Sequence, residues 1–398
     1  MPPRTAPSTH CAVVPFEPAA PPDPLRRLLR DDVLARWRAA DRSVHAPHLV
    51  AVPADDGEHW AAAALVTARP HTAYLKIVDA VGDVPAAVEA VVSHARRLEL
   101  AQVKWEGWTA DPGVAAATGF TPLTVPLNRA NDASGPGSGY VRRLRGGAVA
   151  EPPYAERPSA EPPYAEPPYA EPPYYGQTTH FTCGAVTALV AQAHAGTLPR
   201  GSLDRPAELA LWREATNFPA CEPVGLGVAV RRAWPSSPVE VHLDTDRPVL
   251  LDHYPDGERE WRAILQQTSR TDAGRLGVPI RPGRLSLAAV RSAIGRREQV
   301  LLLVSLAGMQ GFDVPHWVLC HGAVPGAVLI EDPWAEAAAG DTWVDAHLLP
   351  VPDSSLDAMS LISPGPFRGA VVIGPPPRRG SPSPEPAGGG EVRQSVPG

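Results

Sequence analysis

Cys183 pairs a nucleophilic side chain with a position that favours its ionised form. Apolar residues follow it at the spacing of one helix face: Val186, Leu189, Val190 and Ala193. This spacing places Cys183 at or near the N-terminus of a helix. The unpaired N–H groups and the positive dipole end there stabilise a thiolate over a thiol. Cys183 is therefore a candidate nucleophile.

Gln177 lies six residues before Cys183, on the segment that leads into this helix. Its side-chain amide can donate a hydrogen bond to an oxyanion that develops near the sulfur. A nucleophile and an oxyanion donor are two of the parts that a thiol hydrolase needs.

A histidine and an aspartate flank a predicted β-hairpin further along the chain. The turn is supplied by Val324-Pro325-Gly326, and pairing about position 324 sets His316 opposite Asp332 and Cys320 opposite Val328. Asp332 would then hold the ring of His316 in one tautomer and stabilise its charged form. His316 would take the thiol proton of Cys183, which completes the ion pair of a thiol hydrolase.

Each of these residues also has a simpler interpretation. A lone buried cysteine usually packs, a lone histidine is usually a satisfied core or surface group, and Asp-Pro often only ends a strand. The catalytic interpretation is favoured because Gln177, Cys183, His316 and Asp332 occur together and in this order.

The other candidate residues lack such partners. Cys221 also opens a predicted helix, but no glutamine precedes it at the same spacing, so we interpret it as structural. Cys320 lies inside a strand and is predicted to be a core residue. His321 falls on the opposite strand face from His316, which argues against a paired metal site.

Composition excludes several classes of function. The net charge of -7 offers no basic surface for DNA or RNA, and no segment reaches the ~18 apolar residues of a membrane span. The four cysteines form no CxxC pair, so neither a zinc cluster nor a disulfide framework is indicated. A reducing compartment fits these cysteines, and the N-terminus lacks the apolar core of a signal peptide, so we expect a cytoplasmic protein.

The first part of the chain is predicted to combine strands and helices. An amphipathic helix begins at Asp23 with Pro24 in its first turn. Three strands follow, then a helix, a strand, a short helix and a last strand. The predicted ranges are 23–37 for the first helix, 48–52, 60–67 and 73–78 for the strands, and then 85–98, 101–105, 111–118 and 120–127.

This layout, with Ala117-Thr-Gly-Phe-Thr-Pro-Leu123 near its end, resembles the GNAT-type N-acetyltransferase fold. In that family, a glycine-rich turn before the long helix cradles the pyrophosphate of acetyl-CoA with its N–H groups. The corresponding turn, Val78 to Pro85, has one glycine, no arginine and two acidic residues, which would repel a pyrophosphate. The resemblance therefore implies a degenerate domain for docking or substrate presentation, with acetyl transfer as the alternative.

A five-residue repeat with paired prolines and a tyrosine, residues 150–174, separates this part from the next. Paired prolines favour polyproline II geometry, so the repeat is either a spacer or a Pro-Tyr ligand for a partner domain. The predicted organisation is a disordered N-terminus over 1–22, a degenerate GNAT-like α/β domain over 23–129, a Pro-rich linker over 130–173, a peptidase domain over 174–373 and a disordered tail over 374–398.

Gln177-x5-Cys183-Gly184, His316-Trp-Val and Glu331-Asp-Pro-Trp334 resemble the papain-like cysteine peptidase family of the bacteriocin-processing type. Leu209 to Thr216 and Cys221-x-Pro-x-Gly-Leu226 are similar to a bacterial branch in which such a domain occurs beside a GNAT-type domain. The branch usually has proline where this chain has Gly176 and Ala185. The resemblance implies an α+β fold with the cysteine-bearing helix packed on an antiparallel sheet.

It also implies roles for four residues: Cys183 as nucleophile, His316 as base, Asp332 as orienting acid and Gln177 as oxyanion donor. The predicted function is a thiol peptidase or amidase that acts on a peptide or protein through an acyl-enzyme and needs no cofactor or metal. The alternatives are an acyl or peptidyl transferase on the same fold, and a non-catalytic peptide-binding protein.

Overall fold

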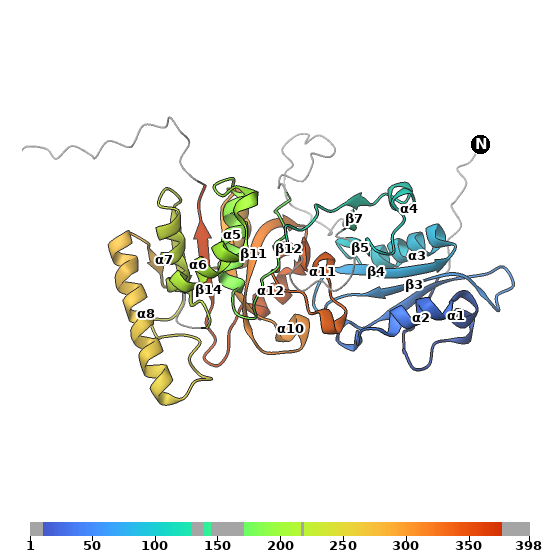
Figure 1. The fold of residues 1–398 in the computed structure, drawn as a ribbon, viewed down its shortest axis with the longest axis horizontal. Coiled ribbons are helices and arrows are strands. Elements are labelled where there is room, and N and C mark those ends of the chain that lie inside the picture. Colours follow the sequence, from blue (N-terminus) through green and yellow to red (C-terminus); the bar gives the residue numbers. More distant parts are fainter. Residues whose placement is uncertain (1–10, 129–137, 145–170, 216–218, 376–398) are drawn as a thin grey trace, which may run out of the picture.

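The computed structural model describes residues 11–128, 138–144, 171–215 and 219–375. Two seven-stranded sheets lie side by side along the long axis of the molecule (Figure 1). The first sheet and its helices are built from residues 11–144, here called the N-terminal part. The second is built from residues 171–375, here called the C-terminal part. Most of the Pro-Tyr repeat lies outside the described residues.

The N-terminal sheet has the strand order β1-β2-β3-β4-β5-β7-β6, and every pair in it is antiparallel except β4 with β5. The parallel pair is joined by α3, which Asp83 caps by accepting from the Ala86 N–H at 3.1 Å. The strands are β1 (Ala12–Pro15), β2 (His48–Pro53), β3 (Trp60–Thr67), β4 (Tyr74–Gly82), β5 (Gln102–Glu106), β6 (Thr121–Pro122) and β7 (Gly139–Arg143).

Helices cover both faces of this sheet (Figure 1). The helix α3 (Val84–Arg97) packs its apolar residues on one face, while α1 (Asp23–Leu28) and α2 (Asp31–Arg38) lie against the other. The sequence predicted one helix over 23–37. It is broken because Leu29 is extended, and the break lets Leu25, Val33 and Trp37 all reach the same core cluster. The remaining helices of this part are η1 (Ser43–His45) and α4 (Pro112–Ala117).

Four predicted boundaries are corrected by the structure. Residues 12–15 are not disordered, because they pair with β2 as an edge strand. Gly139–Arg143, placed in the linker by sequence, is a strand between β5 and β6. The linker also ends before Glu171, whose carboxylate accepts from the Thr124 N–H at 2.7 Å. The predicted tail is anchored at its first residue, because Gly374 N donates to Pro238 O at 2.8 Å.

The C-terminal sheet has the order β13-β12-β11-β10-β14-β8-β9 and is antiparallel except for β8 with β9. An antiparallel sheet with a helical layer on each face agrees with the α+β fold that the sequence predicts. Its strands are β8 (Val239–Leu243), β9 (Ile280–Arg281), β10 (Gln299–Ser305), β11 (Pro315–Val324), β12 (Ala327–Glu331), β13 (Leu349–Pro352) and β14 (Gly369–Ile373).

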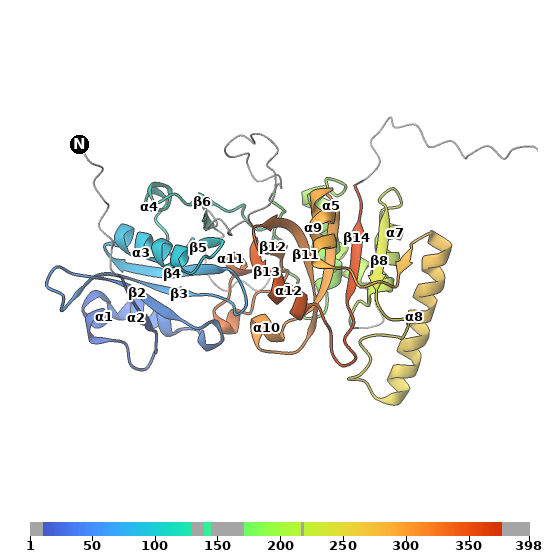
Figure 2. The ribbon, with the colours of Figure 1, turned by 180° about the vertical axis from the view of Figure 1, so that it is seen from behind.

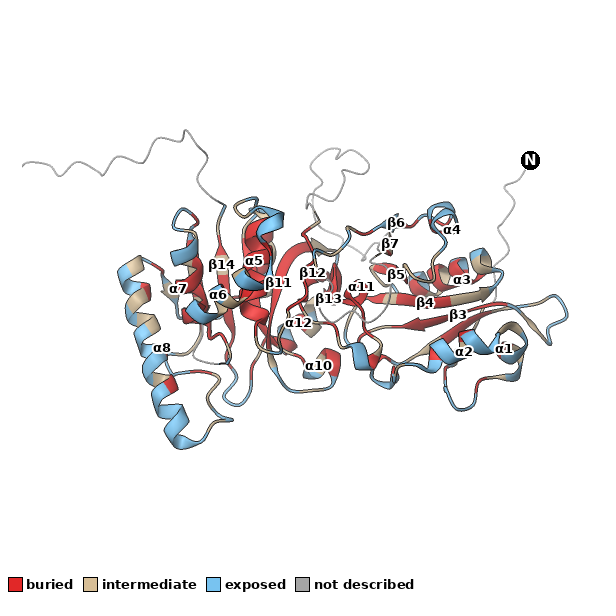
Figure 3. Cartoon of the chain, in the orientation of Figure 1, coloured by how far each residue is buried: buried red, intermediate tan, exposed pale blue. Residues whose placement is uncertain are grey.

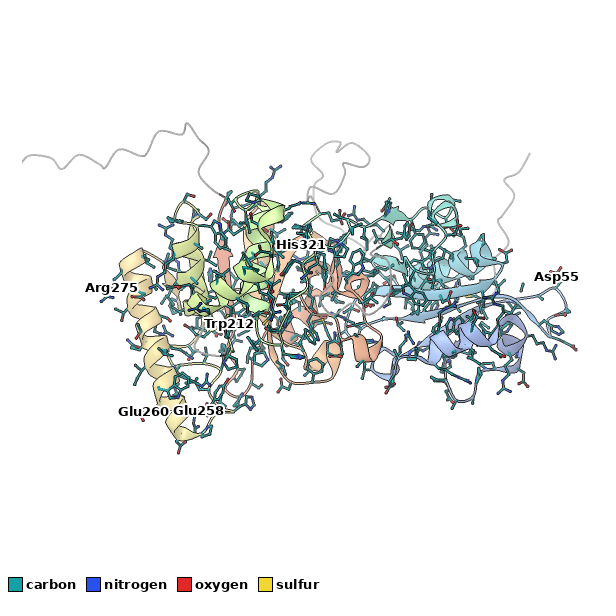
Figure 4. The ribbon with its side chains drawn as sticks, in the orientation of Figure 1. Asp55, Trp212, Glu258, Glu260, Arg275 and His321 are labelled. Carbon is teal, nitrogen blue, oxygen red and sulfur yellow. The ribbon has the colours of Figure 1, made fainter. Side chains whose placement is uncertain are left out.

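The helices α5 and α7 pack on one face of this sheet, with α6 against them, and α9 and α12 pack on the other face (Figure 2). The long helix α8 lies outside α7, and Figure 3 shows that it is far more exposed than α5. Figure 4 shows Glu258, Glu260 and Arg275 along it. The helices are α5 (Cys183–His194), η2 (Arg200–Ser202), α6 (Arg205–Ala215), α7 (Pro223–Ala233), α8 (Asp256–Leu276), α9 (Leu287–Gly295), α10 (Ala307–Gln310), η3 (Ala337–Ala339), α11 (Trp343–Ala346) and α12 (Asp353–Met359).

Among the described residues, no helix has both the length and the apolar character needed to cross a bilayer.

Candidate active site

Cys183 is the first residue of α5, as its spacing from the following apolar residues predicts. The helix differs from the prediction in one respect: its residues from Cys183 to Ala193 are buried on all sides, not on one face. The reason is its position between the sheet strands β10 and β11 and the helices α6 and α7. The side chain of Cys183 therefore stays in a fixed place, with 8% of its surface exposed.

Gly184 allows this close packing. A Cβ atom at this position would lie 3.0 Å from the Cβ of Cys221 and 3.0 Å from Cδ1 of Trp317. Only a residue without a side chain leaves those neighbours undisturbed. The Cys-Gly pair thus combines the candidate nucleophile with the space that its helix needs.

His316 is the second residue of β11, and its ring lies near both of its predicted partners. Its Nε2 lies 2.7 Å from Oδ1 of Asp332, and Cys183 is near enough to the ring to affect its pKa. Burial by itself lowers the pKa of the imidazole. The Asp332 carboxylate and the Cys183 sulfur outweigh burial and raise the pKa of His316 to about 10. The imidazolium is therefore the favoured form at neutral pH.

The predicted register of the hairpin is wrong, although the predicted contact between His316 and Asp332 is present. Cys320 pairs with Ile330 and not with Val328, because the turn is centred later, on Pro325 and Gly326, and a bulge lies between Cys320 and Gly322. On the His316 side of the bulge the pairing is offset by two residues from the prediction. An offset of two keeps every side chain on its own face of the sheet, so His316 meets Asp332 as a diagonal neighbour.

Asp332 is fully buried and accepts three hydrogen bonds. Oδ1 accepts from His316 and from the Trp334 N–H at 2.8 Å, while Oδ2 accepts from Nη1 of Arg69 at 2.6 Å. Burial raises the pKa of this carboxyl, but the positive charges of His316 and Arg69 outweigh it, so the pKa is lowered overall. Asp332 is thus held as a carboxylate.

Arg69 was not predicted, because it belongs to the N-terminal part. It sits in the loop between β3 and β4, and its side chain is fully buried against the C-terminal part. No motif or periodicity marks this position. Its role becomes visible only when the two parts are docked.

Gln177 is buried on the loop before α5, near the other predicted site residues. Its backbone N–H donates to Pro333 O at 2.9 Å, which ties this loop to the residue after Asp332. Its side-chain Nε2 donates to Thr179 O at 2.7 Å. In this structure the amide is therefore engaged within its own loop.

Glu208 organises the same loop and was also missed. This buried carboxylate of α6 accepts from the Thr178 N–H at 2.8 Å, from the Thr182 hydroxyl and from the Tyr175 hydroxyl at 3.2 Å. A signal was present in the sequence, because Glu208 shares the buried helix face with Leu211 and Ala215. An acid at a core-facing position indicates a buried polar function.

The remaining cysteine and histidine candidates are buried, but Cys221 does not open a helix as predicted, because α7 begins two residues later at Pro223. Cys221 is buried beside Gly184, and burial, the charge of Cys183 and Glu222 together raise the pKa of its thiol well above the ordinary range. Burial also raises the pKa of Cys320 to about 12. His321 is labelled in Figure 4, and its Nε2 lies 3.7 Å from Oε2 of Glu331. By strand parity, it lies on the face opposite to the pair of His316 and Asp332. In the described part of the chain, no group of three or more His, Cys, Asp or Glu residues is arranged to hold a metal ion.

A cavity of about 190 Å³ opens beside Cys183. Most of its lining is apolar or aromatic, and the polar side chains include Asp252 and His253. The wall includes Phe181, Leu250, Tyr254, Leu303, Val314, Trp317 and Phe367. A thiol at the rim of an apolar cavity is the expected arrangement for an enzyme that holds part of a substrate next to its nucleophile.

A polar interface joins the two parts of the molecule next to this site. Nζ of Lys76 forms an ion pair with Asp345, and Nζ of Lys104 donates to Asp345 O at 2.9 Å and His347 O at 2.6 Å. Nε2 of Gln102 donates to Leu348 O at 2.6 Å. Both lysines of the chain are thus buried in this interface, where burial lowers the pKa of Lys104 to about 7.

The C-terminal part is thus a mixed α/β unit with one buried cluster of a cysteine at a helix start, a histidine and an aspartate. Cysteine-peptidase-like proteins contain the same set of residue types in one place. Residues 172–374 match the model of a family described as Peptidase_C39 like, and the chain belongs to this family. The crystal structure of a protein assigned as a C39-like peptidase from Bacillus anthracis is similar at a TM-score of 0.28 and 11% identity, over 50% of this chain and 93% of that chain. No curated protein matches the chain.

Proposed function

We propose that this protein is a thiol peptidase or amidase that cleaves its substrate through an acyl-enzyme on Cys183. One observation carries the proposal: His316 is paired with Asp332 at 2.7 Å, Cys183 is near enough to the same ring to raise its pKa, and Cys183 lines an apolar cavity. This is the arrangement in which a thiolate and an imidazolium form an ion pair.

The reaction then follows from the positions of these groups. The Cys183 thiolate attacks the carbonyl carbon of the scissile bond, and the negative charge moves to the carbonyl oxygen. The backbone N–H of Cys183, at the start of α5, and the amide of Gln177 are the proposed donors to this oxyanion. Gln177 must exchange its hydrogen bond to Thr179 for the one to the oxyanion, as catalytic contacts often form only in the complex.

His316 next donates its proton to the leaving amine, and the C–N bond breaks to leave a thioester on Cys183. A water molecule gives a proton back to His316 and attacks the thioester, which releases the acid. Asp332 keeps the ring in one orientation through both proton transfers, because its Oδ1 holds Nε2 at 2.7 Å. An amine in place of water would make the same site a transferase.

The proposed substrate is a peptide or protein with an apolar or aromatic residue next to the scissile bond. Support comes from the cavity beside Cys183, whose wall is mostly apolar and includes Trp317 and Phe367. Membership of the bacteriocin-processing type within this family and a cytoplasmic location also remain part of the proposal. The four cysteines are all free, which fits a reducing compartment.

For the N-terminal part, we propose a GNAT-like domain that does not transfer acetyl groups. The observation behind this is that Asp83 already accepts from the Ala86 N–H at 3.1 Å, so a carboxylate occupies the start of α3 where a pyrophosphate would have to bind. Acetyl-CoA titration by calorimetry tests this point, and saturable binding would contradict it.

Alkylation of Cys183 by iodoacetamide tests the peptidase proposal. We expect fast modification of Cys183 at pH 6 in the intact protein, read at each cysteine by peptide mass spectrometry, and loss of this fast reaction in His316→Ala. Cys221 serves as the internal control, because burial holds it as a thiol. The proposal fails if Cys183 reacts no faster than an ordinary thiol with a pKa of ~8.5 and His316→Ala changes nothing.

A further inference from the structure

We propose that Arg69 of the N-terminal part is a positioning residue of the peptidase site, which fixes Asp332 and through it His316. The site is then complete only when both parts of the chain are docked. The inference rests on the proposed function for its catalytic meaning, although its structural content can be measured independently.

The two carboxylate oxygens of Asp332 have different hydrogen-bond partners, and Arg69 binds one of them. Oδ1 is taken up by His316 and the Trp334 N–H, and Oδ2 accepts from Nη1 of Arg69 at 2.6 Å. A carboxylate held at both oxygens cannot rotate about its terminal bond without losing a charge-assisted hydrogen bond. Arg69 therefore sets the direction from which Oδ1 reaches the imidazole.

The other two nitrogens of the guanidinium, Nη2 and Nε, also have hydrogen-bond partners. Its Nη2 lies 2.8 Å from Oδ2 of Asp341 and donates to Trp334 O at 2.9 Å, and its Nε donates to Oδ2 of Asp341 at 3.1 Å. All three nitrogens of the fork are thus used, with no exposure of the side chain. A lysine offers one nitrogen and cannot reproduce this planar set of contacts.

The loop that carries Arg69 is itself fixed to the C-terminal part. Ala73 N donates to Pro350 O at 2.8 Å, and the hydroxyl of Tyr74 donates to Oδ1 of Asp345 at 2.7 Å. Within the loop, the Thr72 hydroxyl donates to Arg69 O at 2.5 Å. The guanidinium is therefore held against Asp332 from a loop docked on β13 and α11.

Other contacts hold the two parts together without touching Asp332. Lys104 donates to Asp345 O and His347 O, and Gln102 donates to Leu348 O. If Arg69 served docking alone, its loss would resemble the loss of one of these contacts. If it positions Asp332, its loss must also change His316 and Cys183.

The test compares Arg69→Met with the matched interface variant Gln102→Leu, both in the full chain. For Arg69→Met, we expect the rate of Cys183 alkylation at pH 6 and kcat on a cleaved peptide to fall by about 10- to 100-fold, the usual cost of losing a partner that orients a functional histidine. On the acidic limb of the pH profile, the pH above which alkylation of Cys183 becomes fast should rise, because an Asp332 carboxylate that is free to rotate no longer keeps its hydrogen bond to the imidazolium. Gln102→Leu should keep the wild-type rate and profile.

Arg69→Lys covers the case in which Arg69→Met does not fold. It keeps the charge but has one nitrogen, so we expect a folded protein whose alkylation rate is reduced and whose acidic limb is shifted in the same direction. The inference is overturned if a folded Arg69 variant, as judged by circular dichroism and thermal melting, labels Cys183 at the wild-type rate with the wild-type profile.

An NMR titration of His316 separates this inference from the proposed function. The resonance is assigned by its loss in His316→Gln. If wild-type Cys183 proves unreactive while the pKa of His316 still falls in the Arg69 variant, the proposed function fails and the positioning role stands. If wild-type Cys183 is reactive and neither its alkylation nor the titration responds to Arg69, the positioning role fails alone.

Discussion

Replacing Asp332 with asparagine removes the charge that holds His316 protonated while keeping the size of the side chain. The rise in the pKa of His316 from its ordinary value to about 10 corresponds to roughly 5 kcal/mol in favour of the imidazolium, at ~1.4 kcal/mol for each tenfold change. Asp332 is the largest of the groups that raise it, and it also offsets the burial penalty. In Asp332→Asn we therefore expect the pKa of His316 to fall to its ordinary value of ~6.5 or below.

The asparagine also cannot satisfy the three donors that surround the carboxylate. His316, Arg69 and the Trp334 N–H all donate to Asp332, but an amide has one oxygen to accept with. Its NH₂ group must face a donor in either orientation. We expect the variant to lose about 1–3 kcal/mol of stability for this mismatch, besides the loss of the ion pair.

The assay is the rate of Cys183 alkylation from pH 4 to pH 9. An ordinary thiol is ionised to only about 0.3% at pH 6, so loss of the ion pair should slow the reaction there on the order of 100-fold. Asp353→Asn is the control. Asp353 also accepts a hydrogen bond from an arginine, Nη2 of Arg291 at 2.8 Å, but it lies outside the candidate site. An unchanged acidic limb in Asp332→Asn would refute the assignment of Asp332 as the partner that charges His316.

The same variant makes a prediction about stability with a definite sign. The folded-state pKa of His316 lies above its unfolded value, so its contribution is complete below pH ~6.5 and is lost as the pH rises through about 10. The pKa of Asp332 is lowered, so its contribution is present above pH ~4 and lost below. The difference in unfolding free energy between wild type and Asp332→Asn should therefore be largest between about pH 4 and pH 6.5 and should shrink towards pH 10.

Two further variants test the packing and the interface. Gly184→Ala places a Cβ atom 3.0 Å from both Cys221 and Trp317, so we expect it to cost about 1–3 kcal/mol in urea unfolding and to slow Cys183 alkylation; equal stability would refute the close packing. Lys76→Met leaves the buried Asp345 without its ion-pair partner and should cost about 3–5 kcal/mol, measured in the same way, whereas a cost below 1 kcal/mol would show that water reaches this interface.

The arrangement of the candidate site residues in the C-terminal part could be predicted because it depends on short-range patterns. The helix start at Cys183 follows from the spacing of the residues after it. The meeting of His316 with Asp332 follows from strand parity, which survived a register error of two residues because side chains alternate with a period of two. An error of one residue would have put them on opposite faces.

The contribution of the N-terminal part could not be predicted in this way. Arg69 is 263 residues from Asp332 in the chain and sits in a loop, where no periodicity indicates which way a side chain faces. Lys76 and Lys104 are the only lysines, but a low lysine count does not indicate where those residues lie in the fold. They are buried because the two parts of the chain pack against each other. That packing depends on the match between two surfaces, which the sequence of either part does not show by itself.

The polar character of this interface gives a physical reason why it could complete the proposed catalytic site. Buried ion pairs such as Arg69 with Asp332 and Lys76 with Asp345 add little net stability, because desolvation offsets most of their attraction. They instead fix the relative position of the two parts, because each charged group must meet its partner within hydrogen-bond distance or remain buried and unpaired. An apolar interface tolerates small displacements between its two sides, whereas here a displacement of about 1 Å would stretch these contacts beyond hydrogen-bond distance and leave carboxylates without partners. We infer that the interface is charged because Asp332 has to be placed to this accuracy, and the N-terminal part supplies that accuracy through Arg69.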